Sequence, residues 1–235
     1  MATFVLVHGA WHGGWCWRKV VPLLRAERHE VLTPTLTGLG ERAHLASADV
    51  SLSTHIQDVA NVLEWEGLRN VVLAGHSYGG MVITGVADRA ADRVGHLVYL
   101  DAFVPLPGES LHDLVGERAA ARQRESAEGG WKVPPISGSF GVTDSGDLEW
   151  MRGRLVPQPL LTLTNKVVYG APLEQGRFDR TYIWARAPGS TFEATAARLR
   201  ENPSWRYREL ESGHDAMIIE PVRLAELLLE AAAAA

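Results

Sequence analysis

One serine of this chain has the sequence context of a nucleophile. Ser77 lies in the run Gly75-His76-Ser77-Tyr78-Gly79, after the apolar residues 71–74 and before the apolar residues 81–83. A strand that turns this tightly into a helix holds the central side chain at the top of a sheet, and the flanking glycines let the two elements approach. The N–H groups at the start of the helix favour developing negative charge. The pattern predicts a nucleophile elbow that carries out acyl transfer through Ser77.

A serine hydroxyl needs a base to take its proton. His214 has the most suitable position, because it lies between the last predicted strand and the last predicted helix. In a Ser…Asp…His order, the loop at that place presents the base at the top of the sheet. We predict His214 as general base and then general acid. The alternative is an ordinary loop histidine.

Other histidines have structural interpretations. We expect His8 to shape the loop after the first strand, His96 to begin a strand, and His76 to fill the variable position of the elbow. Polar segments, where exposure is expected, contain His29, His44, His55 and His112.

The base in turn needs a carboxylate on its second nitrogen. This carboxylate usually lies in the loop after the strand predicted here at 181–184. That loop reads Ala185-Arg186-Ala187-Pro188-Gly189-Ser190-Thr191 and has no carboxylate. Glu193 is explained by a capping box with Ser190, and Asp215 adjoins His214, a spacing that rarely reaches the far edge of the ring. Asp101 ends the strand after the elbow, where an unpaired carboxylate among apolar neighbours would be costly. We predict Asp101 as the acid; the alternative is a carboxylate that caps a turn.

Two backbone N–H groups are needed to hold the oxyanion. One is expected from Tyr78, directly after the nucleophile, and the other from Ala10 in the glycine-rich run His8-Gly9-Ala10-Trp11-His12 that follows the first strand.

Strand and helix patterns alternate around these residues. Continuous apolar strands separated by helices predict an α/β fold, with a mostly parallel sheet covered by helices on both faces. Strands are expected at 3–7, 29–33, 71–74, 96–100, 181–184 and 205–210. A first helix is expected at 18–28, and a second begins at Thr54 with Gln57 as its capping partner. The helix after the elbow is expected to end near Arg89, and two more helices begin at Ser190 and Pro221. This alternation breaks between about Pro105 and Arg180. We therefore predict a core of residues 1–104 and 180–235 and a lid at 105–179 over the carboxyl edge of the sheet.

Composition narrows the class of protein further. The 235 residues, 46% hydrophobic and 22% charged, are typical of one globular domain. A formal charge of −5 with scattered arginines gives no basic surface for nucleic acid. We expect no targeting or membrane segment, and no metal or organic cofactor, because ligand-spaced His/Cys clusters are absent from the sequence. Cys16, expected to be buried and apolar, is the only cysteine, which favours a reducing compartment such as the cytoplasm.

Together these residues resemble the α/β-hydrolases, and within them the plant methylesterase and hydroxynitrile lyase-like group. The resemblance is closest over residues 4–15, 75–80, 97–105 and 214–217. It implies that Trp131, in a lid segment, lines the acyl pocket. We also expect Trp11 and Phe103 to contact substrate, although core packing would explain the aromatic residues equally well.

The chain departs from this group in two ways. The plant enzymes carry their acid where this chain has Pro188, whereas the setting of Asp101 resembles that of some haloalkane dehalogenases, so we infer that the acid has moved. The cyanohydrin-cleaving members carry a lysine after the catalytic histidine and often a polar residue matching Ala10. This chain has Asp215 and Ala10 instead, which disfavours the lyase.

The resulting prediction is a serine carboxylic ester hydrolase that acts through an acyl-enzyme on a small apolar ester, such as an aryl or methyl ester. A catalytically weak ligand-binding protein of the same fold is the first alternative, motivated by the missing acid after Trp184. Hydrolysis of a lactone, amide or carbon–carbon bond is the second. The sequence does not indicate the oligomeric state.

Overall fold

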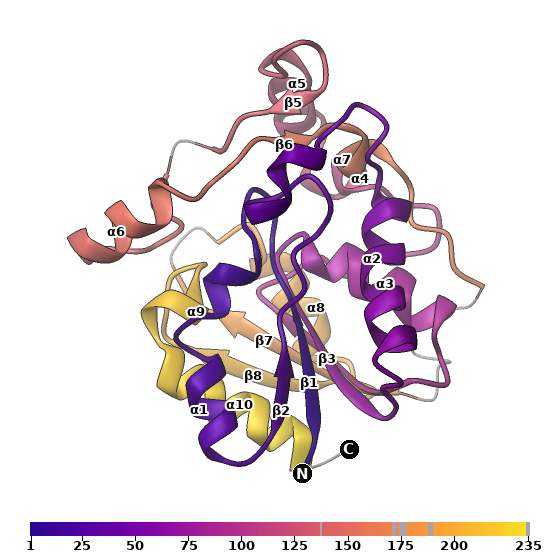
Figure 1. Ribbon diagram of the computed structural model, residues 1–235, viewed down its shortest axis with the longest axis vertical. Helices are drawn as coiled ribbons and strands as arrows, with labels where there is room; N and C mark the ends of the chain where they lie inside the picture. Colours follow the sequence, from indigo (N-terminus) through magenta and orange to yellow (C-terminus); the bar gives the residue numbers. More distant parts are fainter. Residues whose placement is uncertain (137, 171–172, 174–177, 188–189, 234–235) are drawn as a thin grey trace.

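Six strands form the central sheet. The structure is a computed structural model that describes residues 1–235 except 137, 171–172, 174–177, 188–189 and 234–235. The strands are β1 (Thr3–Val7), β2 (Glu30–Leu32), β3 (Val71–His76), β4 (Val94–Leu100), β7 (Asp179–Ala185) and β8 (Arg206–Leu210). They lie in the order β2-β1-β3-β4-β7-β8, and every neighbouring pair is parallel. Each strand expected from the sequence is present, and the predicted α/β fold class is confirmed (Figure 1).

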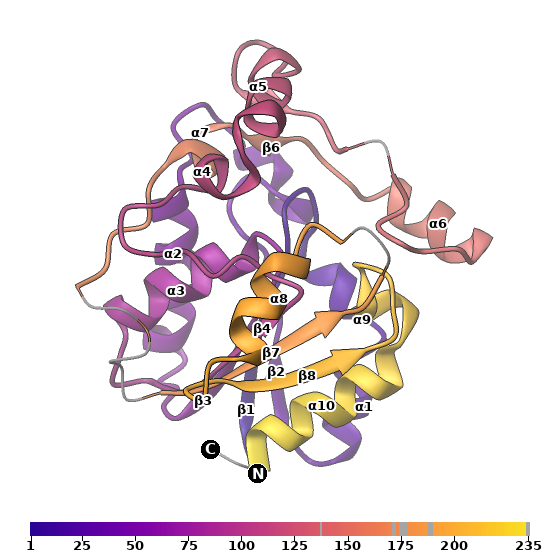
Figure 2. The same ribbon diagram turned by 180° about the vertical axis from the view of Figure 1, so that it is seen from behind.

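Helices cover both faces of this sheet. One face carries α2 (Leu52–Trp65), α3 (Gly79–Arg89) and α8 (Glu193–Arg200). The other carries α1 (Val21–Ala26), α9 (Ala216–Ile219) and α10 (Pro221–Ala233), together with a short 3-10 helix over Gly14–Trp17 (Figures 1 and 2). A second 3-10 helix spans Gly40–Leu45. Because a hydrophobic core fills each side, the central strands are buried on both faces, and Cys16 is buried as expected.

Some helix starts differ from the prediction. Helix α2 begins at Leu52, because Ser51 accepts from the Thr54 N–H at 3.2 Å while the Thr54 hydroxyl accepts from the Ser51 N–H. Gln57, the predicted capping partner, instead bonds to Asn61. Ser51 is therefore the N-cap, with extended backbone at φ −121° and ψ 172°, and Thr54 is its partner in the first helical turn.

Helix α8 also lacks the predicted capping box. It begins at Glu193 after Phe192, and no side chain caps it. Ser190 accepts instead from the Phe192 N–H at 3.2 Å, a local turn that leaves Glu193 in the first helical turn. Helix α1 is shorter than expected, whereas α10 begins at Pro221 as predicted.

The winding of the sheet reverses beside β1. The chain passes from β1 to β2 on one side and returns to β3 on the other. In parallel sheets, a crevice opens outside the carboxyl ends of the strands where the winding reverses. Residues 8–13 leave β1 at that point, and Ser77 follows the end of β3.

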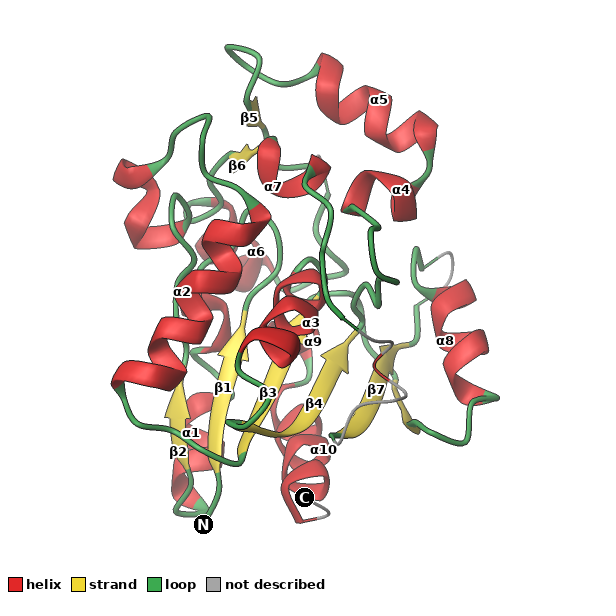
Figure 3. Ribbon diagram, turned by 90° about the vertical axis from the view of Figure 1, so that its right-hand side faces the viewer, coloured by secondary structure: helices red, strands yellow, loops and turns green. Residues whose placement is uncertain are grey.

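Most of the described residues of 105–178, which we call the cap segment, lie beyond the carboxyl ends of the strands, and the last part of the segment returns past α3 to the start of β7 (Figure 3). They form α4 (Leu111–Val115), α5 (Glu117–Glu125), α6 (Ser145–Arg152), α7 (Leu161–Thr164) and an antiparallel pair of β5 (Lys132–Val133) and β6 (Gln158–Pro159). Helix α6 stands apart from the other helices of the segment, and its Trp150 packs edge-on against Trp15 at 5.1 Å. Among helices formed by the described residues, none combines the length and the apolar character needed to cross a bilayer.

Candidate active site

The turn after β3 holds Ser77 in a strained backbone conformation. The φ angle of Ser77 is 55°, in the left-handed region that non-glycine residues rarely adopt. Its N–H donates to the Leu100 carbonyl at 3.2 Å, and its carbonyl accepts from the N–H groups of Gly80 and Phe103. These bonds tie the turn to β4 and to the chain beyond it, so the surrounding structure maintains the strain.

The glycines around Ser77 are required by close packing. A Cβ on Gly79 would lie 2.9 Å from the carbonyl oxygens of both Val7 and His8, and one on Gly75 would lie 2.6 Å from the Gly79 carbonyl oxygen. Cβ atoms do not approach backbone oxygens that closely. The strand, the turn and the helix can therefore meet only with glycine at these positions.

His214 and Asp101 meet beside the turn. The Nδ1 atom of His214 lies 2.6 Å from Oδ2 of Asp101, although the residues come from the ends of β8 and β4. Asp101 is 1% exposed, and its φ of 41° is again left-handed. Burial raises the pKa of Asp101, and the hydrogen bond and charge of His214 oppose that rise. A buried carboxylate on Nδ1 fixes the tautomer that leaves Nε2 as the reactive atom.

The loop after β1 brings a further backbone donor to the site. The His8 ring donates from Nδ1 to the Gly9 carbonyl at 2.8 Å and accepts at Nε2 from the Leu36 N–H at 3.1 Å. Burial lowers the pKa of His8 to about 3, so the ring is neutral, as expected for a residue that shapes the loop. Among the described residues, no protein acceptor receives the N–H of Ala10 or that of Tyr78. Both groups are available to a ligand.

These residues surround one cavity. Its volume is about 590 Å³, and Ser77, Asp101, His214, Ala10 and Tyr78 all line it. The remaining wall is mostly apolar and comes from both the sheet edge and the cap segment, with Phe103, Leu111, Val115, Ile136, Phe140 and Phe192. The structure thus brings five predicted residues to one cavity, where the predicted nucleophile, the predicted base and two N–H groups can face the same ligand.

Trp11 joins the cavity to the cap segment. It lines the cavity, as predicted, with a left-handed φ of 65°. Its N–H donates to Oε1 of Gln158 at 3.0 Å, its indole N–H donates to the Val133 carbonyl at 3.1 Å, and its carbonyl accepts from the Val156 N–H at 3.1 Å. The loop after β1 is therefore bonded to both strands of the small sheet in the cap segment.

Three sequence predictions differ from the structure here. Trp131 is not among the residues that line the cavity; its ring packs under the Lys132 ammonium at 4.9 Å. His55 and His112 were expected to be exposed, but both are buried. His55 bonds to the Tyr78 hydroxyl at 2.9 Å and the Thr37 carbonyl at 2.8 Å, which satisfies its polar atoms inside the core. The position of Pro188, where the related group carries its acid, lies outside the described residues.

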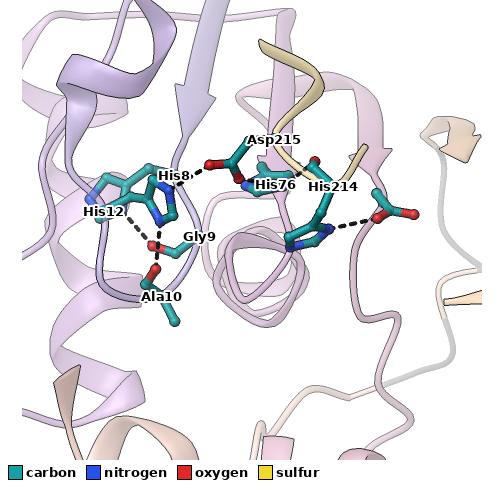
Figure 4. Close-up of polar contacts among 8 residues, drawn as sticks. His8, Gly9, Ala10, His12, His76, His214 and Asp215 are labelled. Atoms are coloured by element: carbon teal, nitrogen blue, oxygen red, sulfur yellow. Dashed lines mark hydrogen bonds and ion pairs between the residues drawn. The ribbon is translucent and has the colours of Figure 1, made fainter. Parts of the chain in front are cut away.

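A buried polar network extends from the site, and little in the sequence pattern predicts it. Asp215 accepts from Nε2 of His12 at 3.0 Å, and Nε2 of His76 donates to the His214 carbonyl at 3.0 Å (Figure 4). The only signal was the short spacing between His8 and His12 in a glycine-rich loop. The network includes the one group of the described chain whose donor atoms are close enough for a metal ion, His76, His214 and Asp215. Each of these side chains already has a protein hydrogen-bond partner.

Comparison with known proteins identifies the family. The model of the alpha/beta hydrolase family matches residues 4–227. The chain belongs to the α/β-hydrolases. A carbendazim hydrolyzing esterase from Nocardioides sp. (strain SG-4G) is 43% identical over 97% of this chain and 98% of its own length. Methylesterase 10 of Arabidopsis thaliana is 28% identical over 98% of this chain and 91% of its own length.

A solved structure agrees with this α/β-hydrolase assignment at the level of the fold. An extracellular α/β-hydrolase from a Paenibacillus species aligns with a TM-score of 0.85 and 24% identity, covering 98% of this chain and 99% of that one. Its low identity supports the fold alone. With the esterase and methylesterase relatives, the family match makes this chain an esterase-type hydrolase, and the resemblance predicted from the sequence is confirmed.

Proposed function

We propose that this α/β-hydrolase is a serine carboxylic ester hydrolase that works through an acyl-enzyme. The observation that carries the proposal is the 2.6 Å contact between His214 Nδ1 and the buried Asp101, at the cavity that Ser77 also lines. A carboxylate at this place compensates for the loop 185–191, which has none. The acid role, usually found after a later strand, is thereby assigned to the end of β4.

Each residue has a defined task in this reaction. His214 takes the hydroxyl proton of Ser77, whose oxygen attacks the ester carbonyl, and the N–H groups of Ala10 and Tyr78 bind the oxyanion. His214 then gives the proton to the departing alcohol, which leaves an acyl group on Ser77. Water, deprotonated by His214, attacks the carbonyl of this acyl-enzyme. His214 returns the proton to the Ser77 oxygen as the acyl–oxygen bond breaks, and the acid is released. Asp101 keeps the imidazole oriented and stabilises its charged form.

The cavity supports a small, largely apolar substrate, such as an aryl or methyl ester. Aromatic side chains contribute much of its wall, and Phe103 and Trp11 are the proposed contacts. The names of the relatives, a carbendazim hydrolyzing esterase and a methylesterase, are consistent with this class. We further propose that the cap segment acts as a lid over residues 1–104 and 180–235. The single cysteine favours a reducing compartment such as the cytoplasm.

The first experiment compares the hydrolysis of a short-chain aryl ester by the wild type and by Asp101→Asn. The amide favours the wrong tautomer of His214, so we expect kcat to fall by roughly 10⁴. Asp144→Asn is the matched control, since this exposed side chain caps α6, a role that asparagine also fills, and its activity should equal that of the wild type.

Other outcomes would revise the proposal in different ways. An active wild type with an active Asp101→Asn variant would keep the esterase but remove Asp101 from the triad. A wild type that hydrolyses no ester, amide or lactone yet binds an ester tightly would favour the ligand-binding alternative. Loss of activity in Ser77→Ala, with the fold intact, separates enzyme turnover from background hydrolysis.

A further inference from the structure

A second carboxylate is buried beside the proposed base, but it does not contact the imidazole of that base. Asp215 is 0% exposed and follows His214 directly in the chain. Its Oδ2 atom instead lies 3.0 Å from Nε2 of His12, which is 1% exposed. The acyl-transfer steps proposed above use neither residue. A pair of buried titratable groups in the loops that carry Ala10 and His214 therefore needs its own explanation.

The other nitrogen of His12 indicates what the pair holds. Nδ1 lies 2.7 Å from the carbonyl oxygen of Ala10. A carbonyl can only accept, so Nδ1 carries a proton, and the carboxylate accepts the proton of Nε2. Burial disfavours the charged ring, but the charge and hydrogen bond of Asp215, helped by the Ala10 carbonyl, raise the pKa of His12. An imidazolium is a planar group with a donor at each end, which suits it to bridge a carboxylate and a carbonyl.

His12 and His8 together fix the direction of two successive peptides in the loop after β1. His8 holds the Gly9 carbonyl and His12 holds the next carbonyl, that of Ala10 (Figure 4). In a trans peptide the N–H points opposite to the C=O. The Ala10 N–H is thus turned away from the ring of His8, and the Trp11 N–H is turned away from the ring of His12 toward Gln158.

The other end of the bridge fixes the loop that carries His214. The Asp215 N–H donates to the Phe140 carbonyl at 2.9 Å, and the His214 carbonyl accepts from His76 Nε2 at 3.0 Å. With the bond from His12, both residues of this loop are held on more than one side. The loops after β1 and after β8 are therefore joined by a single side-chain pair, although the paired residues lie 203 positions apart.

We propose that His12 and Asp215 are positioning residues that hold Ala10, whose N–H is the proposed oxyanion donor, and the base His214 in one rigid unit. His12 anchors Ala10 through its carbonyl, while the peptide that carries the Ala10 N–H is anchored by His8 through Gly9. This rests on the proposed function, because it assigns the pair to the acyl-transfer reaction. A misplacement of about 1 Å in such a unit can lower the rate by roughly 10². The pair itself makes no contact with substrate; it acts through Ala10 and His214.

The sharpest test compares Asp215→Ala with Asp215→Asn. Alanine removes the bridge, and we expect kcat to fall by about 30- to 100-fold, with KM changed less than about 3-fold, because the donor acts in the transition state. Asparagine can donate to a neutral His12 at Nε2 and leave Nδ1 on the Ala10 carbonyl. It should therefore keep kcat within about 5-fold of the wild type.

A second variant separates positioning from folding. His12→Phe with Asp215→Leu replaces the pair by apolar groups of similar volume, a change that is often neutral or stabilising. This double variant should unfold in urea at a midpoint no lower than the wild type, yet lose kcat as Asp215→Ala does. A trifluoromethyl ketone, whose hydrate oxygen occupies the oxyanion site when bound to Ser77, should lose affinity in parallel with kcat.

Distinct results would overturn the inference. A stable double variant with wild-type kcat would mean that the pair has a purely structural role. An Asp215→Asn variant as slow as Asp215→Ala would mean that charge, rather than position, is what matters. Failure of the proposed function is recognised separately, because the wild type would then hydrolyse none of the esters and would not bind the ketone at Ser77.

Discussion

The loops at the carboxyl edge of the sheet and the cap segment use strained backbone differently. At the sheet edge, left-handed φ angles occur at three non-glycine residues with proposed roles, Trp11, Ser77 and Asp101, as well as at Gly38 and Gly40 in the loop after β2. In the described part of the cap segment, positive φ angles occur at glycines, with Phe140 as the exception. Glycine adopts this conformation without penalty, whereas a side-chain residue needs support from its surroundings.

This difference separates two requirements on the sequence. The sheet edge must place specific side chains and N–H groups within tenths of an ångström, so it tolerates strain and packs backbone against backbone. The cap segment supplies apolar wall to the cavity and many exposed polar residues, and its turns are made by residues that cost little. We therefore expect small changes to be severe in the first region and mild in the second.

The largest contrast is expected between two glycine substitutions. A Cβ on Gly80 would lie 2.1 Å from the Phe103 carbonyl oxygen, whereas one on the exposed Gly138 would meet nothing within 4 Å. Gly80→Ala should lower the free energy of unfolding by about 3 kcal/mol, and Gly138→Ala should change it by less than about 0.5 kcal/mol. Urea unfolding measures both. Equal effects would show that backbone packing at the sheet edge is not tighter.

Acid should destabilise the sheet region through its buried neutral histidines. His96, in β4, bonds to the Thr181 hydroxyl at 2.8 Å, and burial lowers its pKa to about 4. The unfolded chain binds this proton from about pH 6.5 downward while the folded chain does not. Stability is therefore lost as the pH falls from 6.5 toward 4, by about 1.4 kcal/mol per pH unit for this residue.

His96→Asn should remove that contribution from the acid limb of the stability curve. The matched variant is His112→Asn in the cap segment, where burial also lowers the pKa, opposed by the Gln123 side chain, and where the histidine is 8% exposed while His96 is 0% exposed. Urea unfolding between pH 5 and 7 should give a shallower slope for His96→Asn than for His112→Asn. Identical slopes in the two variants would contradict the assignment of His96 as the stronger acid-sensitive group.

The smallest contrast concerns two aromatic residues at the substrate cavity. Phe103 lines the cavity and packs edge-on against Phe192 at 4.8 Å, whereas Trp131 does not line it. Phe103→Ala should lower kcat/KM for an aryl ester by about tenfold, the effect of one lost apolar contact. Trp131→Ala should change it by less than about 3-fold, a neutral surface effect. A larger effect for Trp131 would restore its predicted role as a substrate contact.

The strands and the main site residues could be predicted because local patterns determine them. Ser77, Asp101 and His214 each follow a strand, and parallel strands end at one edge of the sheet. The burial of His55 could not be predicted, since its polar neighbours in the sequence suggested exposure. Its buried position depends on Tyr78 and on the Thr37 carbonyl, which only the folded chain brings near.

The pairing of His12 with Asp215 could not be predicted from the sequence either. The adjacency of Asp215 to His214 disfavours Asp215 as the acid for that ring, and in the structure its carboxylate contacts the ring of His12. Its true partner depends on the exact path of the loop after β1. The role of Trp131 as a substrate contact rests on a resemblance in the cap segment. The short elements and long connections of that segment leave little periodic pattern from which to predict which side chains face the cavity.

The three bonds between Trp11 and the cap segment have a consequence for how this hydrolase would select substrates by size. An acyl group too large for the cavity would push outward on the cap segment, which forms part of the cavity wall, and so pull on Trp11, the residue next to Ala10. The oxyanion donor would then be turned while the substrate was still bound. Discrimination against bulky esters would consequently appear as slow turnover of a bound substrate rather than as weak binding.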